Sequence, residues 1–225
     1  MDTISTVRGT HITLPCLEVG DLTEVGSLDG DKVIEFSYGP ARLRELWLAG
    51  THLIDGRVTG LTTQRATWRG TRLHAVEFSG CDLSGLDWSG STLTRVVFID
   101  CKLMGAALDG LVLEDVLFER CRLDYATLIR LRTSGPVIVS GCSLREATVT
   151  ACDLTRAAFT GCDLHQTTFD GGTYRGCDLR GNDLSGVRGA TSLTKVTIDR
   201  SQMPGLAQAV AAELGVVFGE DLNES

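Results

Sequence analysis

Cysteine is the residue type whose number and spacing in this sequence most directly suggest chemistry. The chain has 225 residues, and eight of them are cysteines. No two cysteines show the two-residue spacing of a zinc-binding or redox motif. Small apolar side chains in a core explain the pattern better than ligation does. The sequence therefore predicts free, unreactive thiols in the interior, with Cys16 outside the set, at Cys81, Cys101, Cys121, Cys142, Cys152, Cys162 and Cys177.

The other residue types that could do chemistry form no catalytic or metal-binding pattern. The four histidines form no metal-like pair, and we expect surface positions for His11, His52, His74 and His165. The sequence contains no Gly-x-Ser-x-Gly elbow, Walker loop or His-Glu-x-x-His helix. Because no motif supplies a nucleophile or selects a pair of carboxylates, we expect no enzyme, no cofactor and no metal site.

A repeat of five residues positions the cysteines. Large apolar residues recur at every fifth position from Leu28 to Thr133, and again from Val139 to Leu184. The register slips by one residue near 134–136, and 30 of the 32 positions fit the pattern. A second position, two residues earlier, is small and holds the seven cysteines. A period of five fits neither an α-helix nor an ordinary strand. It fits a chain that turns a corner every five residues, points two side chains inward and closes a square coil after four corners.

The run Cys81–Gly85 resembles the motif of the pentapeptide-repeat proteins, which is a small residue, Asp or Asn, Leu or Phe, and two variable residues. The resemblance covers about residues 28–186. It implies an all-β solenoid, namely a right-handed quadrilateral parallel β-helix of about eight coils and about 38 Å in length. Residues one coil apart would then share a face, and Phe78, Phe98 and Phe118 form such a column.

Two further features of the repeat carry structural expectations. The aspartates before the central residue are expected to bond to local backbone at the corners, and they are Asp82, Asp87, Asp153, Asp163, Asp178 and Asp183. The extra residue in Ser134-Gly135-Pro136 is expected to form a bulge, which is either tolerated or marks a binding site. Disulfides between neighbouring coils fit the strand spacing, but no secretion signal supports them.

The residues outside the repeat are expected to close the two ends of the coil, because each end exposes an unpaired strand edge. The predicted domains are an N-terminal cap at 1–27, the β-helix at 28–200 and a C-terminal cap at 201–225. Within the first cap, His11–Leu14 is a candidate strand that Pro15 ends.

The C-terminal segment predicts a short capping helix followed by a short strand. The helix is expected to start with Ser201 as its N-cap and to stop near Gly215, and Val216–Phe218 would form the strand. An apolar stripe on this segment either closes the last coil or joins two copies of the chain in a homodimer, as the resemblance implies. The candidate dimer contact consists of Met203, Leu206, Val210, Leu214, Val217 and Phe218.

The resemblance also implies a function. It points to a non-catalytic rod that binds a protein partner, whose identity the sequence does not give. The alternative comes from the same family, because some members mimic duplex DNA, bind type II topoisomerases such as DNA gyrase and protect them from quinolone-like inhibitors. That role needs acidic columns along the rod and a dimer joined at the C-terminal end.

The distribution of charge separates these two functions. The chain has a net charge of −8, but residues 41–200 hold 18 acidic and 19 basic residues. A neutral rod disfavours DNA mimicry, which needs a dense phosphate-like field, unless the arginines gather on other faces. We expect no direct nucleic-acid binding by such an acidic chain. The charge pattern therefore favours the protein-interaction rod.

Two local features bear on location. The first residues lack the basic and apolar regions of a signal peptide. No apolar run approaches the length of a membrane-spanning helix. We therefore expect a cytoplasmic protein without membrane contact.

Overall fold

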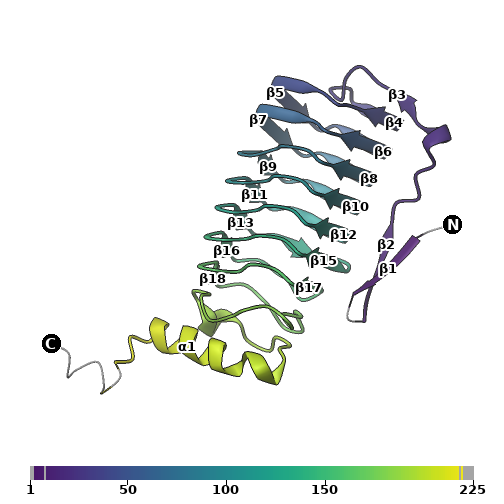
Figure 1. Cartoon of the computed structure of the whole chain (residues 1–225). Coiled ribbons are helices and arrows are strands. Elements are labelled where there is room, and N and C mark those ends of the chain that lie inside the picture. Colours follow the sequence, from purple (N-terminus) through teal and green to yellow (C-terminus); the bar gives the residue numbers. More distant parts are fainter. Residues whose placement is uncertain (1–2, 8, 218, 220–225) are drawn as a thin grey trace.

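The protein is a parallel β-solenoid in which the chain winds repeatedly around one axis (Figure 1). The computed structural model describes residues 3–7, 9–217 and 219. Within these residues the strands stack along the axis, and one α-helix, α1 (Met203–Glu213), lies at the C-terminal end. The all-β solenoid with a short C-terminal helix that the sequence predicts is therefore confirmed.

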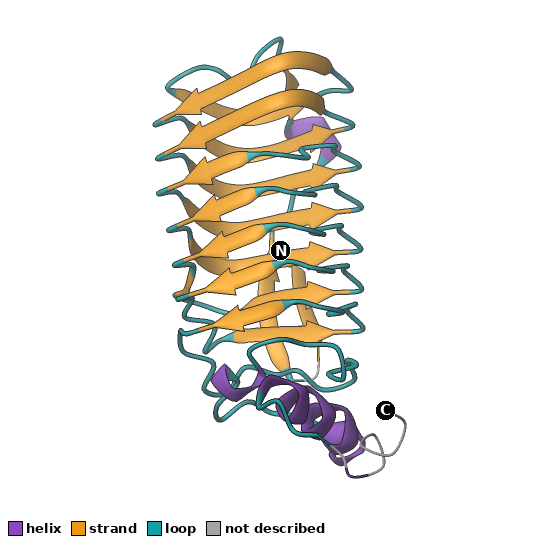
Figure 2. Cartoon of the chain, turned by 90° about the vertical axis from the view of Figure 1, so that its left-hand side faces the viewer, coloured by secondary structure: helices purple, strands orange, loops and turns teal. Residues whose placement is uncertain are grey.

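Two parallel sheets form the walls of the solenoid (Figure 2). The first sheet has nine strands, which are β3 (Thr23–Glu24), β4 (Lys32–Tyr38), β6 (His52–Thr59), β8 (Arg72–Ser79), β10 (Thr92–Ile99), β12 (Val112–Glu119), β14 (Arg132–Thr133), β15 (Val137–Ser140) and β17 (Ala157–Thr160). The second has seven strands, one for each turn, which are β5 (Arg42–Ala49), β7 (Thr62–Arg69), β9 (Asp87–Ser89), β11 (Ala107–Asp109), β13 (Thr127–Ile129), β16 (Thr148–Thr150) and β18 (Thr168–Asp170). Isolated bridges such as that between Asp178 and Thr197 extend the stack beyond these strands.

Many corners of the coils lie at residues with positive φ, two positions after a central inward residue. Five strands bend in this way, at φ of 48°, 49°, 51°, 54° and 52°, at Glu35, Asp55, Ala75, Arg95 and Asp115. Glycine occupies many other corners, as at Gly80 with φ of 60°. Positive φ is unfavourable for residues that carry a Cβ atom. The corners therefore account for much of the glycine in the sequence.

The inward side chains form four columns, after which we name the four faces of the rod. These are the leucine face (Leu73, Leu93, Leu113), the phenylalanine face (Phe78, Phe98, Phe118), the cysteine face (Leu83, Leu103, Leu123, with Cys81, Cys101 and Cys121) and the tryptophan face (Trp68, Trp88, Leu108). Phe98 stacks between Phe78 and Phe118, with ring centroids 4.8 and 4.9 Å apart. This distance is the spacing between paired strands, so each coil adds one ring to the stack.

The register slip predicted from the sequence lies between β12 and β15. Before the slip, paired residues are one regular coil apart, but Phe118 pairs with Val139 across it. The N–H groups of Ser134 and Gly135 both donate to the carbonyl oxygen of Leu113, at 2.9 and 3.3 Å. Two residues thus oppose one at this position, which defines a β-bulge.

The N-terminal residues do not form one cap, as predicted, but two separate parts. A hairpin of β1 (Thr3–Val7) and β2 (Thr10–Leu14) lies along the outside of the phenylalanine face, against β10, β12 and β15 (Figure 1). The candidate strand at His11–Leu14 is therefore confirmed. The segment that follows, with the 3-10 turn η1 (Val19–Asp21) and β3, leads to the first end of the rod, where β3 pairs with β4. Only this second part closes an end.

The C-terminal end is closed by the 3-10 turns η2 (Ala190–Ser192) and η3 (Arg200–Gln202) and by α1. The helix begins one residue later than predicted, because Ser201 lies inside η3 and Gln202 is the N-cap of α1. The Gln202 Nε2 atom donates to the carbonyl oxygens of Leu179 and Asn182 at 2.9 and 2.7 Å. These bonds tie the start of the helix to the last coil.

The segment after α1 differs from its prediction. Val216 and Val217 lie in neither a helix nor a strand, so the expected strand is absent at these two positions. Phe218, the third residue of that strand, lies outside the described residues. No strand within the described part of the chain pairs with this short apolar run.

Candidate interaction surfaces

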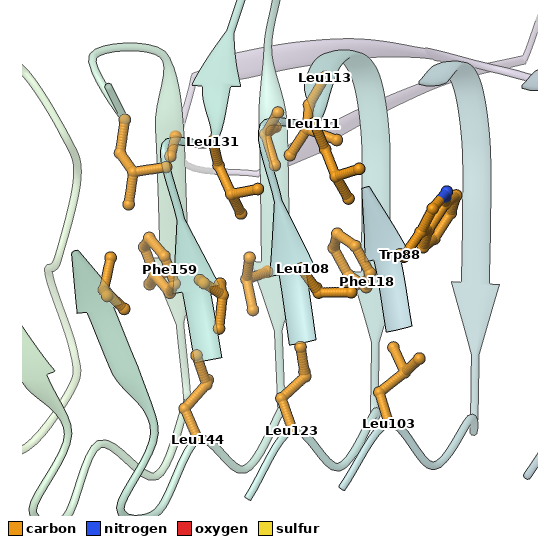
Figure 3. A pocket seen from close by; sticks show the side chains of 16 residues that line it. Trp88, Leu103, Leu108, Leu111, Leu113, Phe118, Leu123, Leu131, Leu144 and Phe159 are labelled. Carbon is orange, nitrogen blue, oxygen red and sulfur yellow. The ribbon is translucent and has the colours of Figure 1, made fainter. Parts of the chain in front are cut away.

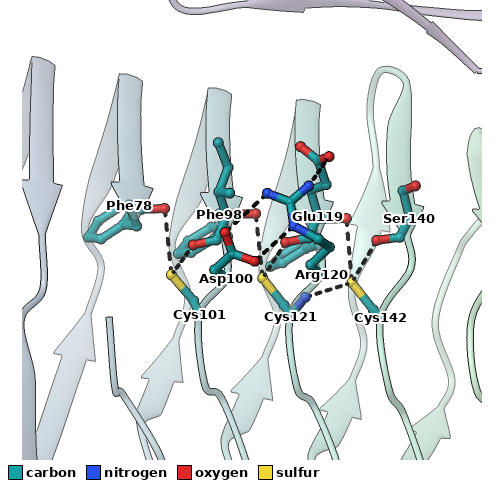
Figure 4. A network of polar contacts seen from close by, with 11 residues as sticks. Phe78, Phe98, Asp100, Cys101, Glu119, Arg120, Cys121, Ser140 and Cys142 are labelled. Carbon is teal, nitrogen blue, oxygen red and sulfur yellow. Dashed lines mark hydrogen bonds and ion pairs between the residues drawn. The ribbon is translucent and has the colours of Figure 1, made fainter. Parts of the chain in front are cut away.

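Five interior cysteines form a ladder along the cysteine face, part of which Figure 4 shows, and they are Cys81, Cys101, Cys121, Cys142 and Cys162. Cys152 and Cys177 lie on other faces. The Sγ atoms of the ladder donate to backbone oxygens of the neighbouring coil, as in the contact from Cys101 to the oxygen of Phe78 at 3.5 Å. All seven are buried and free, as predicted, and Cys16 is exposed. Burial raises the pKa of the Cys152 thiol to about 11 and that of the Cys177 thiol to about 12. These two thiols are protonated at neutral pH and lack the thiolate character of a nucleophile.

The aspartates of the repeat bond to the backbone at the corners, as predicted. In Asp183, Oδ1 accepts a hydrogen bond from the N–H of Ser185 at 2.9 Å. The same contact, two residues along the chain, is made by Asp82, Asp153, Asp163 and Asp178. Asp87 differs, because its carboxylate lies 3.3 Å from Arg69 instead. The bond from Ser185 lowers the pKa of the Asp183 carboxyl, so this group is an ionised structural element.

Charged side chains on the outer surface pair between neighbouring coils. The Arg120 Nε and Nη2 atoms lie 2.8 and 3.0 Å from the two carboxylate oxygens of Asp100, and the same guanidinium contacts Glu119 (Figure 4). Six further pairs join adjacent coils: Arg57–Glu77, Arg65–Glu45, Arg69–Asp87, Lys102–Asp82, Arg130–Asp109 and Arg145–Asp163. Exposed pairs of this kind contribute little stability each, but they neutralise charge locally.

The outward columns carry no run of acidic residues on the two faces that the ion pairs cover most densely. On the cysteine face, bridged residues of successive coils are Asp82, Lys102, Arg122, Ser143 and Asp163. On the tryptophan face they are Asp87, Ala107, Thr127, Thr148 and Thr168. A mimic of duplex DNA needs like charges at regular spacing, as phosphates have. The arginines therefore do not gather apart from the acids on these faces.

Three large side chains of the rod are exposed to solvent. Trp47 on β5 is 67% exposed, Tyr125 is 57% exposed and Ile34 on β4 is 44% exposed. Trp47 shares its strand with Arg42 and Arg44. Aromatic residues and arginines are enriched at protein interfaces. Sequence reasoning missed these three residues, although the repeat itself gives the signal, since all three stand at positions that point outward.

The residues of the predicted dimer contact divide between two roles. Leu206 and Val210 pack against the core of the rod, so they belong to the cap of the last coil. Phe218 lies outside the described residues. The members that remain exposed are Met203, Leu214 and Val217. The structure thus leaves part of the predicted set on the surface, with Met203 at the start of α1 and Leu214 and Val217 after its end.

A second apolar surface, which the sequence analysis also missed, lies beneath the N-terminal hairpin. We call it the outer strip, and it consists of Val97, Leu117 and Ile138. Each of these residues precedes a central residue of the phenylalanine face and therefore points outward. They form a cluster with Ile12 of β2 that is separate from the main core. Apolar residues at outward positions of three successive coils were the available signal.

The interior holds an apolar cavity of about 40 Å³ close to the bulge (Figure 3). Its lining includes Trp88, Leu108 and Phe118. This volume is well below the ~300–1,000 Å³ of ligand pockets, and the cavity is therefore a packing defect. Among the described residues, no cluster of His, Cys, Asp or Glu could hold a metal ion. None of the helices in that same part of the chain has the length and hydropathy of a membrane-spanning segment.

Comparison with known proteins agrees with the five-residue period. A family model described as pentapeptide repeats matches the chain in eight copies, within residues 71–110 and 140–173. About a third of the chain therefore consists of segments that match pentapeptide repeats. The matched segments lie on both sides of the bulge, where the coils are regular. Among curated proteins, none matches the chain at a significant level.

Solved structures similar to this chain include two forms of QnrB1, a plasmid-mediated fluoroquinolone resistance protein. A trypsin-treated QnrB1 variant is 20% identical, covers 79% of this chain and 99% of its own, and has a TM-score of 0.46. Full-length QnrB1 is 17% identical, covers 80% and 99%, and has a TM-score of 0.38. HetL from the cyanobacterium Nostoc sp. strain PCC 7120, a pentapeptide repeat protein involved in heterocyst differentiation regulation, is 19% identical, covers 73% and 86%, and has a TM-score of 0.33.

Proposed function

We propose that this protein is a non-catalytic, cytoplasmic rod that binds a protein partner through its outward side chains. One observation carries the proposal, namely the contrast on the surface of the rod. Charged side chains are matched between coils, whereas Trp47 on β5 and Tyr125 at a corner of the rod are exposed. A rigid support reduces the entropy lost on association. Exposed aromatic residues on such a support have the properties of interface anchors.

The surroundings of Trp47 favour an acidic partner. Arg42 and Arg44 stand on the same strand as Trp47, and within the described residues no ion pair involves either of them. Arg65 on the next coil is already neutralised by Glu45, at 2.9 Å. The two remaining arginines attract carboxylates, and such attraction accelerates association and fixes orientation. The partner that fits this end of the rod presents acidic side chains around an apolar anchor pocket.

Affinity capture with matched variants tests the proposed function. The wild-type protein, Trp47→Ala and Arg130→Ala serve as baits in extract of the native host, and bound proteins are quantified by mass spectrometry. We expect one protein to be enriched by the wild type and by Arg130→Ala, and to fall at least about tenfold with Trp47→Ala, as for an interface hot spot. Equal recovery on all three baits would contradict the role of Trp47.

We also propose that two copies associate through the C-terminal end. The exposed Met203, Leu214 and Val217 support this contact, because apolar side chains clustered at one end of a rod are typical of an association surface. Light scattering is expected to give the mass of a dimer for the wild type and of a monomer for Leu214→Asp. A monomeric wild type at working concentration would exclude the homodimer.

The alternative of a DNA mimic that protects a topoisomerase is not favoured by the surface. Mimicry requires a continuous acidic field, whereas Asp82 and Asp100 are each paired with a base of the next coil. DNA gyrase supercoiling with and without a quinolone, at excess protein, tests this alternative. We expect no protection of the enzyme, and a clear restoration of supercoiling would replace the acidic partner with a topoisomerase.

A further inference from the structure

The solenoid does not need apolar side chains at the positions of the outer strip in order to fold. Its three residues occupy outward positions, which on the cysteine face hold residues such as Asp82 and Lys102. Nevertheless Val97, Leu117 and Ile138 are 4%, 6% and 0% exposed. Their cover comes from the N-terminal hairpin, since they cluster with Ile12 rather than with the core. An apolar column at outward positions calls for a binding role rather than a folding role.

Strand β2 attaches the hairpin to the strip. Ile12 packs on the outer strip and is 1% exposed, and Leu14 packs against the same cluster. The N–H of Thr13 donates to Oδ1 of Asp115 at 3.2 Å. Asp115 is itself a corner residue with φ of 52°, so its carboxylate is presented at the edge of the face. These contacts hold β2 against the strip.

The bulge lies where the hairpin meets the rod. Thr10, the first residue of β2, lines a surface depression together with Pro136 and Arg156. Ile138 follows the bulge by two residues and completes the strip. The bulge at 134–136 therefore lies at one end of the outer strip, where the hairpin packs. Bulges often occur next to binding sites, and this position fits that role.

The hairpin has little stability of its own. It contains two strands of five residues joined only to each other, and isolated two-stranded hairpins are marginally stable in water. It remains on the strip because residues 15–22 tether it there, so its local concentration is high. A tethered segment of marginal stability is open to competition by a segment that binds the strip more tightly.

We propose that the outer strip is a binding surface for an extended segment of a partner protein, and that the N-terminal hairpin occupies it until that segment displaces it. The fitting segment is a β-strand with branched aliphatic side chains at alternate positions, as Ile12 and Leu14 have, and short polar residues between them. This inference rests on the proposed role as a protein-binding rod. It uses a surface distinct from Trp47, so each can fail without the other.

A labelled peptide with the sequence of residues 3–14 serves as the probe. In the full-length variant Ile12→Asp, the hairpin leaves the strip, because an unpaired carboxylate is unfavourable in an apolar site. We expect this variant to bind the peptide at least about tenfold more tightly than the wild type, whose own hairpin competes. The double variant Ile12→Asp with Leu117→Asp is the matched control, and it is expected to lose the binding while its circular dichroism stays that of a β-solenoid.

Two results would overturn the proposal. The first is a folded Ile12→Asp variant that does not bind the peptide, since the strip would then accept no separate strand. The second concerns exchange of hairpins between two copies, measured in the Leu214→Asp background to remove the C-terminal contact. If the Leu214→Asp variant is a dimer and the added Ile12→Asp substitution makes it a monomer, then the strip binds the hairpin of a second copy rather than a segment of a partner protein. A monomer in both forms, together with tight peptide binding, supports the proposal.

Discussion

Two apolar columns stand back to back on the same three strands. The inward column is Phe98, Phe118 and Val139, and the outward column is their preceding neighbours Val97, Leu117 and Ile138. Both columns are buried. The inward one is covered by the other faces of each coil, whereas the outward one is covered by a hairpin from the far N-terminus. Equal burial therefore arises in two different ways.

The different cover of the two columns distinguishes apolar residues that the rod needs in order to fold from apolar residues that it does not need. The inward column recurs in every coil and cannot be exposed without unwinding the rod. The outward column is confined to three coils, and lifting one short hairpin would expose it. The contribution of the inward column to the stability of the rod explains why its residues are apolar. The outward column adds an apolar surface that a solenoid of this kind does not need. The predictions below compare the two columns with each other, with the interior thiols and with the outer ion pairs.

The largest expected effect is on the interior thiols at alkaline pH. Their unfolded pKa is 9.0, and in the folded chain it is raised to about 11 for Cys152 and about 12 for Cys177. Above pH 9 the unfolded state loses protons that the folded state keeps, so stability that is complete below about pH 9 falls as the pH rises toward about 12. The losses of stability from the individual buried thiols add up. Urea unfolding at pH 8, 9 and 10 should show this decline, and Cys177→Ala should make it shallower. An unchanged slope would contradict the assignment.

The next effect is on the inward column. Phe98→Ala removes the ring that stacks at 4.8 and 4.9 Å on its two neighbours, and we expect a loss of about 3–5 kcal/mol in the free energy of unfolding. Denaturant unfolding measures the loss. Phe98→Leu keeps most of the volume and is expected to cost less. A loss below 1 kcal/mol for Phe98→Ala would mean that the stack is not a continuous core.

A smaller effect is expected on the outward column. Leu117→Ser is predicted to reduce the free energy of unfolding by no more than the ~1.5–3 kcal/mol that burial of one aliphatic side chain contributes, because the hairpin can lift away. The same denaturant experiment compares it with Phe98→Ala. If Leu117→Ser were the more harmful of the two, the outer strip would be part of the core and the distinction between the columns would fail.

The smallest effect is expected for the ion pairs of the polar faces. Lys102→Ala removes a pair with Asp82 at 3.3 Å in which both side chains are partly exposed. We expect a loss below about 1 kcal/mol that shrinks further in high salt. The Arg120 guanidinium bonds both carboxylate oxygens of Asp100. Arg120→Ala therefore tests whether a pair with two hydrogen bonds contributes more to the free energy of unfolding. A loss comparable to that of Phe98→Ala would show that charge rather than core packing holds the coils together.

The sequence predicted the features that repeat and missed those that occur once. The stacked rings at Phe78, Phe98 and Phe118 and the slip before Val139 could be predicted, because each coil imposes the same inward positions. The docking of Ile12 could not, since a five-residue strand carries no information on which face it will meet. The outer strip had a signal at Leu117 and its neighbours, namely apolar residues at outward positions.

The ends show the same limit of sequence reasoning. The apolar spacing predicted α1, but not which residues would face the rod, because that depends on how the last coil ends. Leu206 and Val210 face the core, whereas Leu214 lies on the surface. The cap at Ser201 was misplaced because Gln202 finds partners in the preceding coil, at Leu179 and Asn182, which a local reading does not reveal.

Hydrogen exchange measured residue by residue tests most directly whether the outer strip is covered reversibly. The amides of β2 are compared with those of β10 and β12 at several low urea concentrations. If the hairpin opens on its own, β2 exchanges about tenfold faster or more, with little dependence on urea, while the two ladder strands exchange only through larger openings. If all three strands exchange at one rate and with one urea dependence, the hairpin leaves only when the rod unfolds, and the outer strip is not a binding surface.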